Sequence, residues 1–172
     1  MRLTVQSVLS IDVPAPVQKL VTQSLLDQYT TGRSDRKVRA QIQDLDYDEC
    51  FPSGVVDENM AACSLSGIWL LHGFLDDSHE ISQSVKTREG SYWHGIMHRL
   101  EGDFRNSKYW YRQVGTHPIY EQMPGSPWAP SEFVDLCEAA QSASDESAIT
   151  VQSLAATEWK LLFEYCYSHA VK

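Results

Sequence analysis

The sequence lacks any long uninterrupted apolar run. A membrane-spanning helix needs roughly 18 or more consecutive apolar residues, and the longest candidate here, GIWLLHGFL at 67–75, is broken by His72 and Gly73. The first sixteen residues alternate polar and apolar side chains and reach two prolines before an apolar stretch of signal-peptide length develops. We therefore expect no membrane association and a cytoplasmic location.

Positive charge is also scarce. The chain has 14 Lys and Arg against 23 Asp and Glu, which gives a formal net charge of -9. Binding to nucleic acid and to anionic membranes draws on a summed positive potential, so this balance argues against both. The four cysteines lie far apart and form no C-x-x-C pair, which favours reduced thiols over a disulfide framework.

Several catalytic and nucleotide-binding signatures are missing as well. The sequence contains no P-loop and no G-x-G-x-x-G, so nucleotide binding through a glycine-rich loop is disfavoured. It contains no G-x-S-x-G elbow, and strand-like patterns are nearly absent. No catalytic residue is therefore assigned from a motif.

What is present is helical periodicity in a chain of ordinary globular composition, 172 residues long and 42% hydrophobic. This length is typical of one domain, so we predict an all-α, single-domain helical bundle of about six to eight helices over 1–172. We expect an extended N-terminal arm at 1–16 and a proline-rich loop at 124–130. Apolar spacing predicts helices near 16–32, 34–45, 58–83 with an interruption at residues 66–67, 91–101, 103–115, 131–143 and 147–169.

Four of the six histidines occur within 27 positions, accompanied by carboxylates. If 72–83 is one helix, His72, Asp76 and His79 fall on one face, because residues three or four apart project together. His94 and His98 share a face of the next helix in the same way. A short connection makes the two helices antiparallel neighbours, so the predicted metal ligands are His72, Asp76, His79, His94 and His98.

Imidazole and carboxylate ligands suit a divalent metal such as zinc, iron or manganese, and nickel also fits. Glu101, one turn after His98, is available as an outer carboxylate that fixes an imidazole tautomer. Against a metal, the sequence has no H-E-x-x-H or E-x-x-H pattern. Hydrogen-bonded structural histidines and a pocket for a non-metal ligand therefore stay open as alternatives.

A second polar face follows directly along the chain, in a segment unusually rich in basic residues for so acidic a protein. Arginine grips phosphate or carboxylate as a bidentate fork, and an aromatic ring offers a stacking surface. The predicted ligand-binding residues are Arg99, Arg105, Lys108, Tyr109 and Arg112. The alternative is a solvated face whose basic groups pair with nearby acidic residues.

Two resemblances arise in this region. The segment GSYWHGIMHRLEGDFRNSKYWYRQV at 90–114 looks like one tetratricopeptide unit, which would make it a helix-turn-helix. Residues 93–118, which read W-H-G-I-M-H-R and later N-S-K-Y-W-Y-R-Q-V-G-T-H-P, resemble an uncharacterised family with no assigned activity. That resemblance implies a shared motif that includes Trp93, His94, His98, Arg99, Asn106, Lys108, Tyr109, Trp110, Arg112 and His117.

Two functional hypotheses result. In the first, a pocket lined by the histidines, Asp76 and the arginines binds a small anionic molecule, with or without a divalent metal. An enzymatic version would use a neutral histidine as the base and an arginine to hold the anion. In the second, the helices at 91–115 present Tyr92, Trp110 and Arg112 to a protein partner. A homo-oligomer is compatible with either hypothesis.

Overall fold

The structure is a computed structural model that describes residues 9–23, 36–125, 127–141 and 145–171. Within these ranges the regular elements are helical, apart from one isolated antiparallel bridge between Val55 and Val171. The predicted all-α class is confirmed. The helices are α1 Ala15–Gln23, α2 Arg36–Gln43, α3 Tyr47–Cys50, α4 Glu58–Leu71, α5 Leu75–Ser84, α6 Arg88–Glu101, α7 Phe104–Val114, the 3₁₀-helix η2 Pro118–Gln122, α8 Pro130–Ala140 and α9 Asp145–Ala170.

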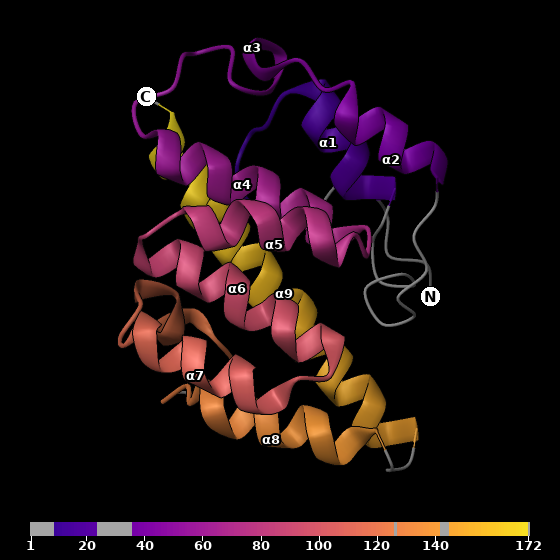
Figure 1. Ribbon diagram of the computed structural model, residues 1–172, viewed down its shortest axis with the longest axis vertical. Coiled ribbons are helices and arrows are strands. Elements are labelled where there is room, and N and C mark those ends of the chain that lie inside the picture. Colours follow the sequence, from indigo (N-terminus) through magenta and orange to yellow (C-terminus); the bar gives the residue numbers. More distant parts are fainter. Residues whose placement is uncertain (1–8, 24–35, 126, 142–144, 172) are drawn as a thin grey trace.

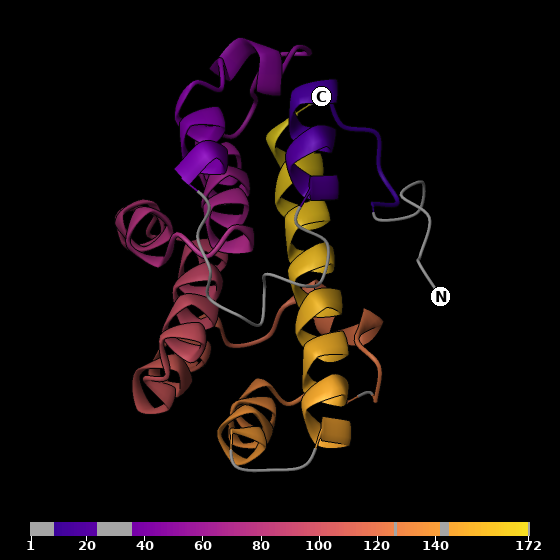
Figure 2. The same ribbon diagram turned by 90° about the vertical axis from the view of Figure 1, so that its right-hand side faces the viewer.

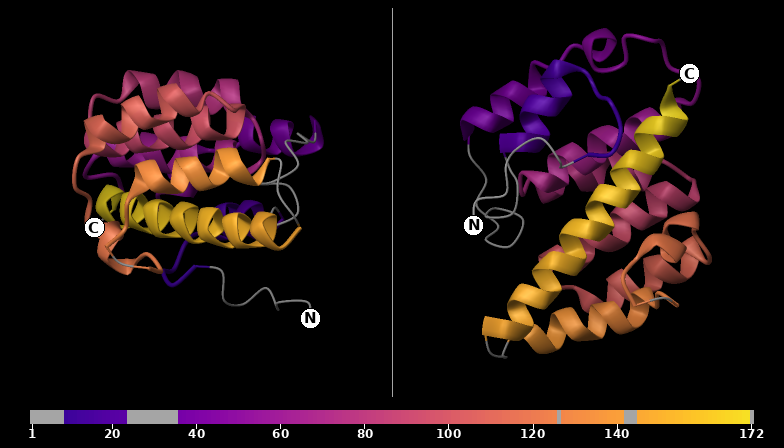
Figure 3. Two further views of the ribbon diagram at one scale, coloured as in Figure 1. Left: turned by 90° about the horizontal axis from the view of Figure 1, so that it is seen from below. Right: turned by 180° about the vertical axis from the view of Figure 1, so that it is seen from behind.

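Helices α4 to α8 follow one another down the molecule, and each packs against the next α-helix, including α7 on α8, which η2 separates in the chain (Figure 1). Helix α9 has 26 residues and is therefore about 39 Å long at 1.5 Å per residue. It runs along the height of the molecule and packs on α4, η2 and α8 (Figures 2 and 3). No helix in the described ranges has both the length and the apolar content of a membrane span.

Side-chain caps fix where the central helices begin. Asp57 accepts hydrogen bonds from two backbone amides in the first turn of α4, and Thr87 and Asp103 each accept one such bond at the start of α6 and α7. Such caps satisfy amides that have no partner inside the helix. Gly102 ends α6 in the left-handed region at φ 91°, where glycine has no steric penalty. The turn between α6 and α7 is therefore specified locally by two adjacent residues.

The central helices approach one another closely at glycines. A Cβ atom on Gly67 of α4 would lie 2.8 Å from the ring of Trp93 in α6. Trp159 of α9 donates its indole N–H to the Gly67 carbonyl at 2.8 Å, so three helices meet at this point. A Cβ atom on Gly90 would lie only 2.2 Å from the carbonyl oxygen of Val85. The sharp passage from α5 into α6, which sets the relative position of their histidines, therefore requires glycine.

A buried ion pair crosses the core between α6 and α9. An Nη atom of Arg99 lies 2.6 Å from an Oε atom of Glu158, and the Glu158 side chain is fully buried. Tyr111 of α7 donates a hydrogen bond to the other carboxylate oxygen at 3.0 Å, and Tyr92 does so at 3.1 Å. Burial of a charge is tolerated when its remaining lone pairs are satisfied. This cluster therefore fixes α6, α7 and α9 relative to one another.

The observed elements differ from the predicted ones at several ends. Helix α1 begins at Ala15, inside the segment expected to be an extended arm, and residues 1–8 of that arm lie outside the described residues. The predicted helix start at Ser34 also lies outside them. The described ranges hold nine α-helices instead of six to eight, because α3 is a four-residue helix and 58–83 forms two helices.

The division of 58–83 occurs later than predicted. Residues 66–67 lie inside the continuous helix α4, and the chain turns instead at 72–74. Gly73 adopts φ 75° at this turn, a conformation that ordinary residues avoid. The predicted helix through His72 and His79 therefore does not exist, and this changes which histidines share a face.

Candidate metal centre

Three histidines converge at the contact between α5 and α6. One ligand atom from each of His79, His94 and His98 lies within 4.8 Å of the others. The ring centroid of His79 is 4.6 Å from that of His94 and 5.6 Å from that of His98, and the last two are 4.8 Å apart. His94 and His98 are one turn apart on α6, and α5 supplies His79 from the neighbouring helix.

His94 occupies the most enclosed position of the three. Its side chain is 3% exposed, and its ring stacks on Trp110 of α7 with the centroids 4.0 Å apart. Burial, and then the charges of His79, His98 and Lys86, lower the pKa of His94 to about 4. Its Nδ1 atom is buried and has no hydrogen-bond partner in the described part of the chain. At pH 7 His94 is therefore a neutral imidazole with an unsatisfied buried nitrogen.

The tautomer of His98 is set by a carboxylate. Nδ1 of His98 lies 3.0 Å from Oε2 of Glu101, one turn later on α6. An ionised carboxylate only accepts hydrogen bonds, so we assign the proton of His98 to Nδ1. This leaves the in-plane lone pair on Nε2. A carboxylate that orients a histidine in this way is a common partner of metal-ligating imidazoles.

Asn106 of α7 contacts the same ring from the side. Its Nδ2 lies 3.0 Å from Nε2 of His98 and 3.4 Å from Nδ1. The Nε2 lone pair points outward in the ring plane, away from Nδ1. A donor on that lone pair would therefore be farther from Nδ1 than from Nε2 by nearly the distance between the two ring nitrogens. The similarity of the two distances therefore places the amide over the ring face. The lone-pair direction of Nε2 is not the direction that Asn106 occupies.

Binding an ion would draw the three rings together. Zinc–nitrogen bonds of about 2.0–2.1 Å place the nitrogens of a tetrahedral site roughly 3.4 Å apart. The widest ligand-atom separation among these histidines is at most 4.8 Å. Side-chain rotation can bring the ligand nitrogens together by this difference. His79 is only half-buried and therefore has the most room to rotate.

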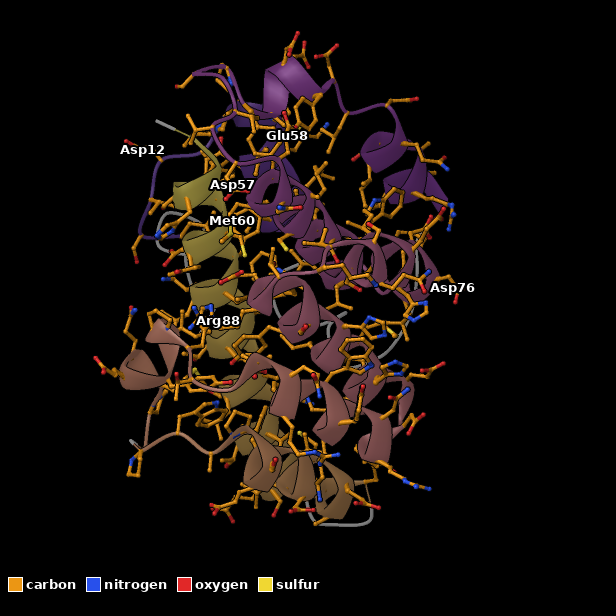
Figure 4. The ribbon with its side chains drawn as sticks, turned by 60° about the vertical axis from the view of Figure 1, so that its left-hand side comes forward. Asp12, Asp57, Glu58, Met60, Asp76 and Arg88 are labelled. Atoms are coloured by element: carbon orange, nitrogen blue, oxygen red, sulfur yellow. The ribbon has the colours of Figure 1, made fainter. Side chains whose placement is uncertain are left out.

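Two predicted ligands lie elsewhere. His72 follows the last residue of α4, and its Nε2 is 3.1 Å from the carbonyl oxygen of Leu20 in α1. Its burial, which is the largest influence, lowers its pKa. Asp76 is exposed at the outer edge of α5 (Figure 4). The turn at 72–74 separates His72 from the helix that carries His79. Asp76 lies on that helix three residues before His79, but its side chain is exposed and it is not part of the group formed by the three histidines.

Four of the five predicted ligand-binding residues face away from the histidines, and the fifth, Tyr109, has its ring centroid 5.4 Å from that of Trp110. Arg99 is buried and paired with Glu158, on the side of α6 that faces α9. The remaining four belong to α7 and are Arg105, Lys108, Tyr109 and Arg112. On that helix, Arg105, Lys108 and Arg112 point about 100° or more away from Asn106, which faces His98. Lys108 forms an ion pair with Asp135 of α8, in keeping with the alternative of a solvated, charge-paired face.

The α7 residues that do touch the histidines are Asn106 and Trp110. Their four-residue spacing puts them on one face of α7, but the pattern does not reveal that this face meets α6. The structure also removes Tyr92 from the interface hypothesis, because this residue is fully buried against Glu158. Trp110 is half-buried and Arg112 is exposed, so the rest of that hypothesis stays a prediction.

Comparison of the chain with protein-family models, with curated proteins and with solved structures finds no match. The resemblances of 90–114 and 93–118 therefore stay predictions, and the candidate site is argued from its own geometry.

Proposed function

We propose that the protein binds a divalent transition-metal ion, zinc in the first instance, through His79, His94 and His98. The observation that carries the proposal is the convergence of three imidazoles from two helices, with ligand atoms within 4.8 Å of one another. Proteins hold zinc with histidine nitrogens in sites of this kind.

The protonation states support the proposal. A metal ligand must offer a lone pair, and the low pKa of His94 keeps that ring neutral at physiological pH. For His98 the Glu101 carboxylate holds the proton on Nδ1 and directs Nε2 toward a ligand role. The His94 imidazole therefore already has the neutral state that coordination demands, and Glu101 is placed to orient the ring of His98.

The donor set favours zinc over two of the other ions that fit the sequence. Manganese prefers oxygen ligands, whereas this cluster offers nitrogen. Non-haem iron in oxygenases uses two histidines and one carboxylate, and Asp76, the carboxylate predicted for that position, is exposed on α5. Nickel also accepts imidazole ligands and is the natural second ion to examine.

A zinc ion with three histidine ligands keeps a fourth position for water or for a small anion. The anionic ligand expected from the sequence would bind there, beside the ring of Trp110. In this form the proposal needs none of the basic residues on the outer face of α7.

Calorimetric titration of zinc into protein stripped with a chelator tests the proposal. We expect one zinc ion per chain, with the affinity lowered at least tenfold in His79→Gln and in His94→Gln. The matched control is His169→Gln, because His169 is exposed on α9, far along the chain from the three histidines, and its Nδ1 lies 2.7 Å from the carbonyl oxygen of Tyr165, one turn earlier. Zinc uptake that is equal in all four proteins would contradict the assignment.

Trp110 provides an independent readout. Because its ring stacks on His94, a paramagnetic ion such as Co²⁺ in the site should quench its fluorescence. We expect saturable quenching in the native protein and most of that quenching to be lost in Trp110→Phe, which keeps an aromatic ring against His94. Quenching of the same size in Trp110→Phe would place the ion elsewhere.

A further inference from the structure

A hollow lies on the opposite side of α6 from the histidines, between the α4–α5 turn and helices α6 to α9. Its volume is about 290 Å³. Its walls are mainly apolar and include Leu70, Leu100, Phe104 and Val151. Figure 1 shows α8 and the first part of α9 together at the end of the molecule where this cavity lies. No histidine contributes to its lining, so it is a site distinct from the candidate metal centre.

Small residues on α8 and α9 hold the cavity open. Ala140, Ala148 and Ala155 line it, although each belongs to a helix in which larger apolar residues are common. A core hollow forfeits packing contacts that larger side chains would make. Three alanines along one boundary therefore keep a space that leucines would fill.

The charged groups near the cavity are already neutralised. Arg99 contributes to the wall, and its guanidinium is paired with the buried carboxylate of Glu158. Cys137 also lines the cavity, and burial raises the pKa of its thiol to about 11, so it stays protonated. An anionic ligand would have to compete with Glu158, and a cation would meet the like charge of Arg99. The wall therefore suits an uncharged molecule.

The size of the cavity bounds the ligand. A cavity of about 150 Å³ lined by aliphatic and aromatic side chains holds benzene, and this one is about twice as large. Gln141 and Gln152 line the cavity and are exposed, so they mark where it reaches solvent. A molecule with an apolar body and one hydrogen-bonding group could leave that group beside these amides.

We propose that this cavity binds a small uncharged apolar molecule of about the size of a bicyclic aromatic ring. The binding is independent of the metal site, so it is expected in both metal-free and zinc-loaded protein.

Indole is the probe, and calorimetry of the full chain is the measurement. For a ligand of this size, with few heavy atoms, we expect a Kd of about 0.1–1 mM. Indole-3-carboxylate, which has the same rings and a negative charge, should bind at least tenfold more weakly. No detectable indole binding up to 10 mM, or tighter binding of the carboxylate, would overturn the proposal.

Two variants and one chemical readout locate the binding. Ala148→Phe places a ring in the cavity and should weaken indole at least tenfold, whereas Ile149→Phe, at the adjacent and largely exposed position, should leave the affinity unchanged. In the native protein, bound indole should slow the reaction of Cys137 with a maleimide at least threefold. Because this protection experiment needs no substitution, it decides the location even if Ala148→Phe fails to fold. An unchanged maleimide rate at saturating indole would exclude this cavity.

Discussion

Protonation of His94 should destabilise the metal-free protein. The unfolded chain binds a proton at this residue near its ordinary pKa of 6.5, whereas the folded protein binds it only near a pKa of about 4. As the pH falls below 6.5, the unfolded state therefore gains protons first and stability decreases, until the loss is complete below about pH 4. The groups that face His94 are His79 from α5, His98 from α6 and the ammonium of Lys86.

The magnitude follows from the two pKa values. Linkage gives a contribution of RT ln[(1 + 10^(6.5−pH))/(1 + 10^(4−pH))], which amounts to about 2 kcal/mol of lost stability between pH 7 and pH 5. Other groups titrate in this range, so the quantity to measure is the difference from a variant in which position 94 cannot be protonated. His94→Phe serves, because phenylalanine keeps a ring that stacks on Trp110.

Urea unfolding of both proteins at pH 7 and pH 5, in the presence of a chelator, gives the four free energies. The native protein should lose about 2 kcal/mol more than His94→Phe over this interval. His169→Gln, which alters an exposed histidine, should behave as the native protein does. If the native protein and His94→Phe lose the same stability between pH 7 and pH 5, the surroundings do not hold His94 neutral. The argument that its lowered pKa prepares it as a metal ligand then fails.

Three further predictions concern the frame around the site. Gly90→Ala should destabilise the fold by about 1–3 kcal/mol, because its Cβ would meet the Val85 carbonyl oxygen at 2.2 Å. Gly95→Ala has its nearest contacts at 3.5 Å and should instead stabilise α6 by about 0.5–1 kcal/mol. Thermal or urea unfolding measures both changes. Glu158→Gln should lower the free energy of unfolding by about 3–5 kcal/mol, because it leaves the buried Arg99 without its counter-charge. The double variant Glu158→Gln, Arg99→Met should recover most of this loss. If the single and the double variant are equally destabilised, the two residues do not stabilise the fold as a pair. Glu101→Gln should lower zinc affinity about 10–100-fold without unfolding the chain, and an unchanged affinity would remove Glu101 from the site.

Local sequence signals predicted much of the fold. Helix ends came from capping residues and glycines that act within a few positions, as at the turn formed by Gly102 and Asp103. The break between α4 and α5 was predicted at the wrong glycine. Gly67 lies inside a continuous helix, where it allows the Trp93 ring to approach closely, and Gly73 forms the actual turn. A lone glycine in an apolar helical pattern does not reveal which of these two roles it has.

The same distinction applies to the candidate site. Features that depend on spacing within one helix were predictable, and features that depend on contacts distant in the sequence were not. The pair of His94 and His98, and the reach of Glu101 to His98, depend on spacing within one helix and were predictable. The departure of His72 was not, because it depends on the turn at 72–74 and on a backbone carbonyl of α1, far away in the sequence. Burial of Arg99 was likewise hidden, since its partner Glu158 lies 59 positions later.

The most direct test of the central claim is a crystal structure of zinc-loaded protein, with the ion located by anomalous scattering at the zinc edge. The account predicts one ion between α5 and α6, bonded to nitrogens of His79, His94 and His98 at about 2.0–2.1 Å, with Glu101 still on Nδ1 of His98. An ion bound only at surface carboxylates, with the three imidazoles in their present positions, would contradict it.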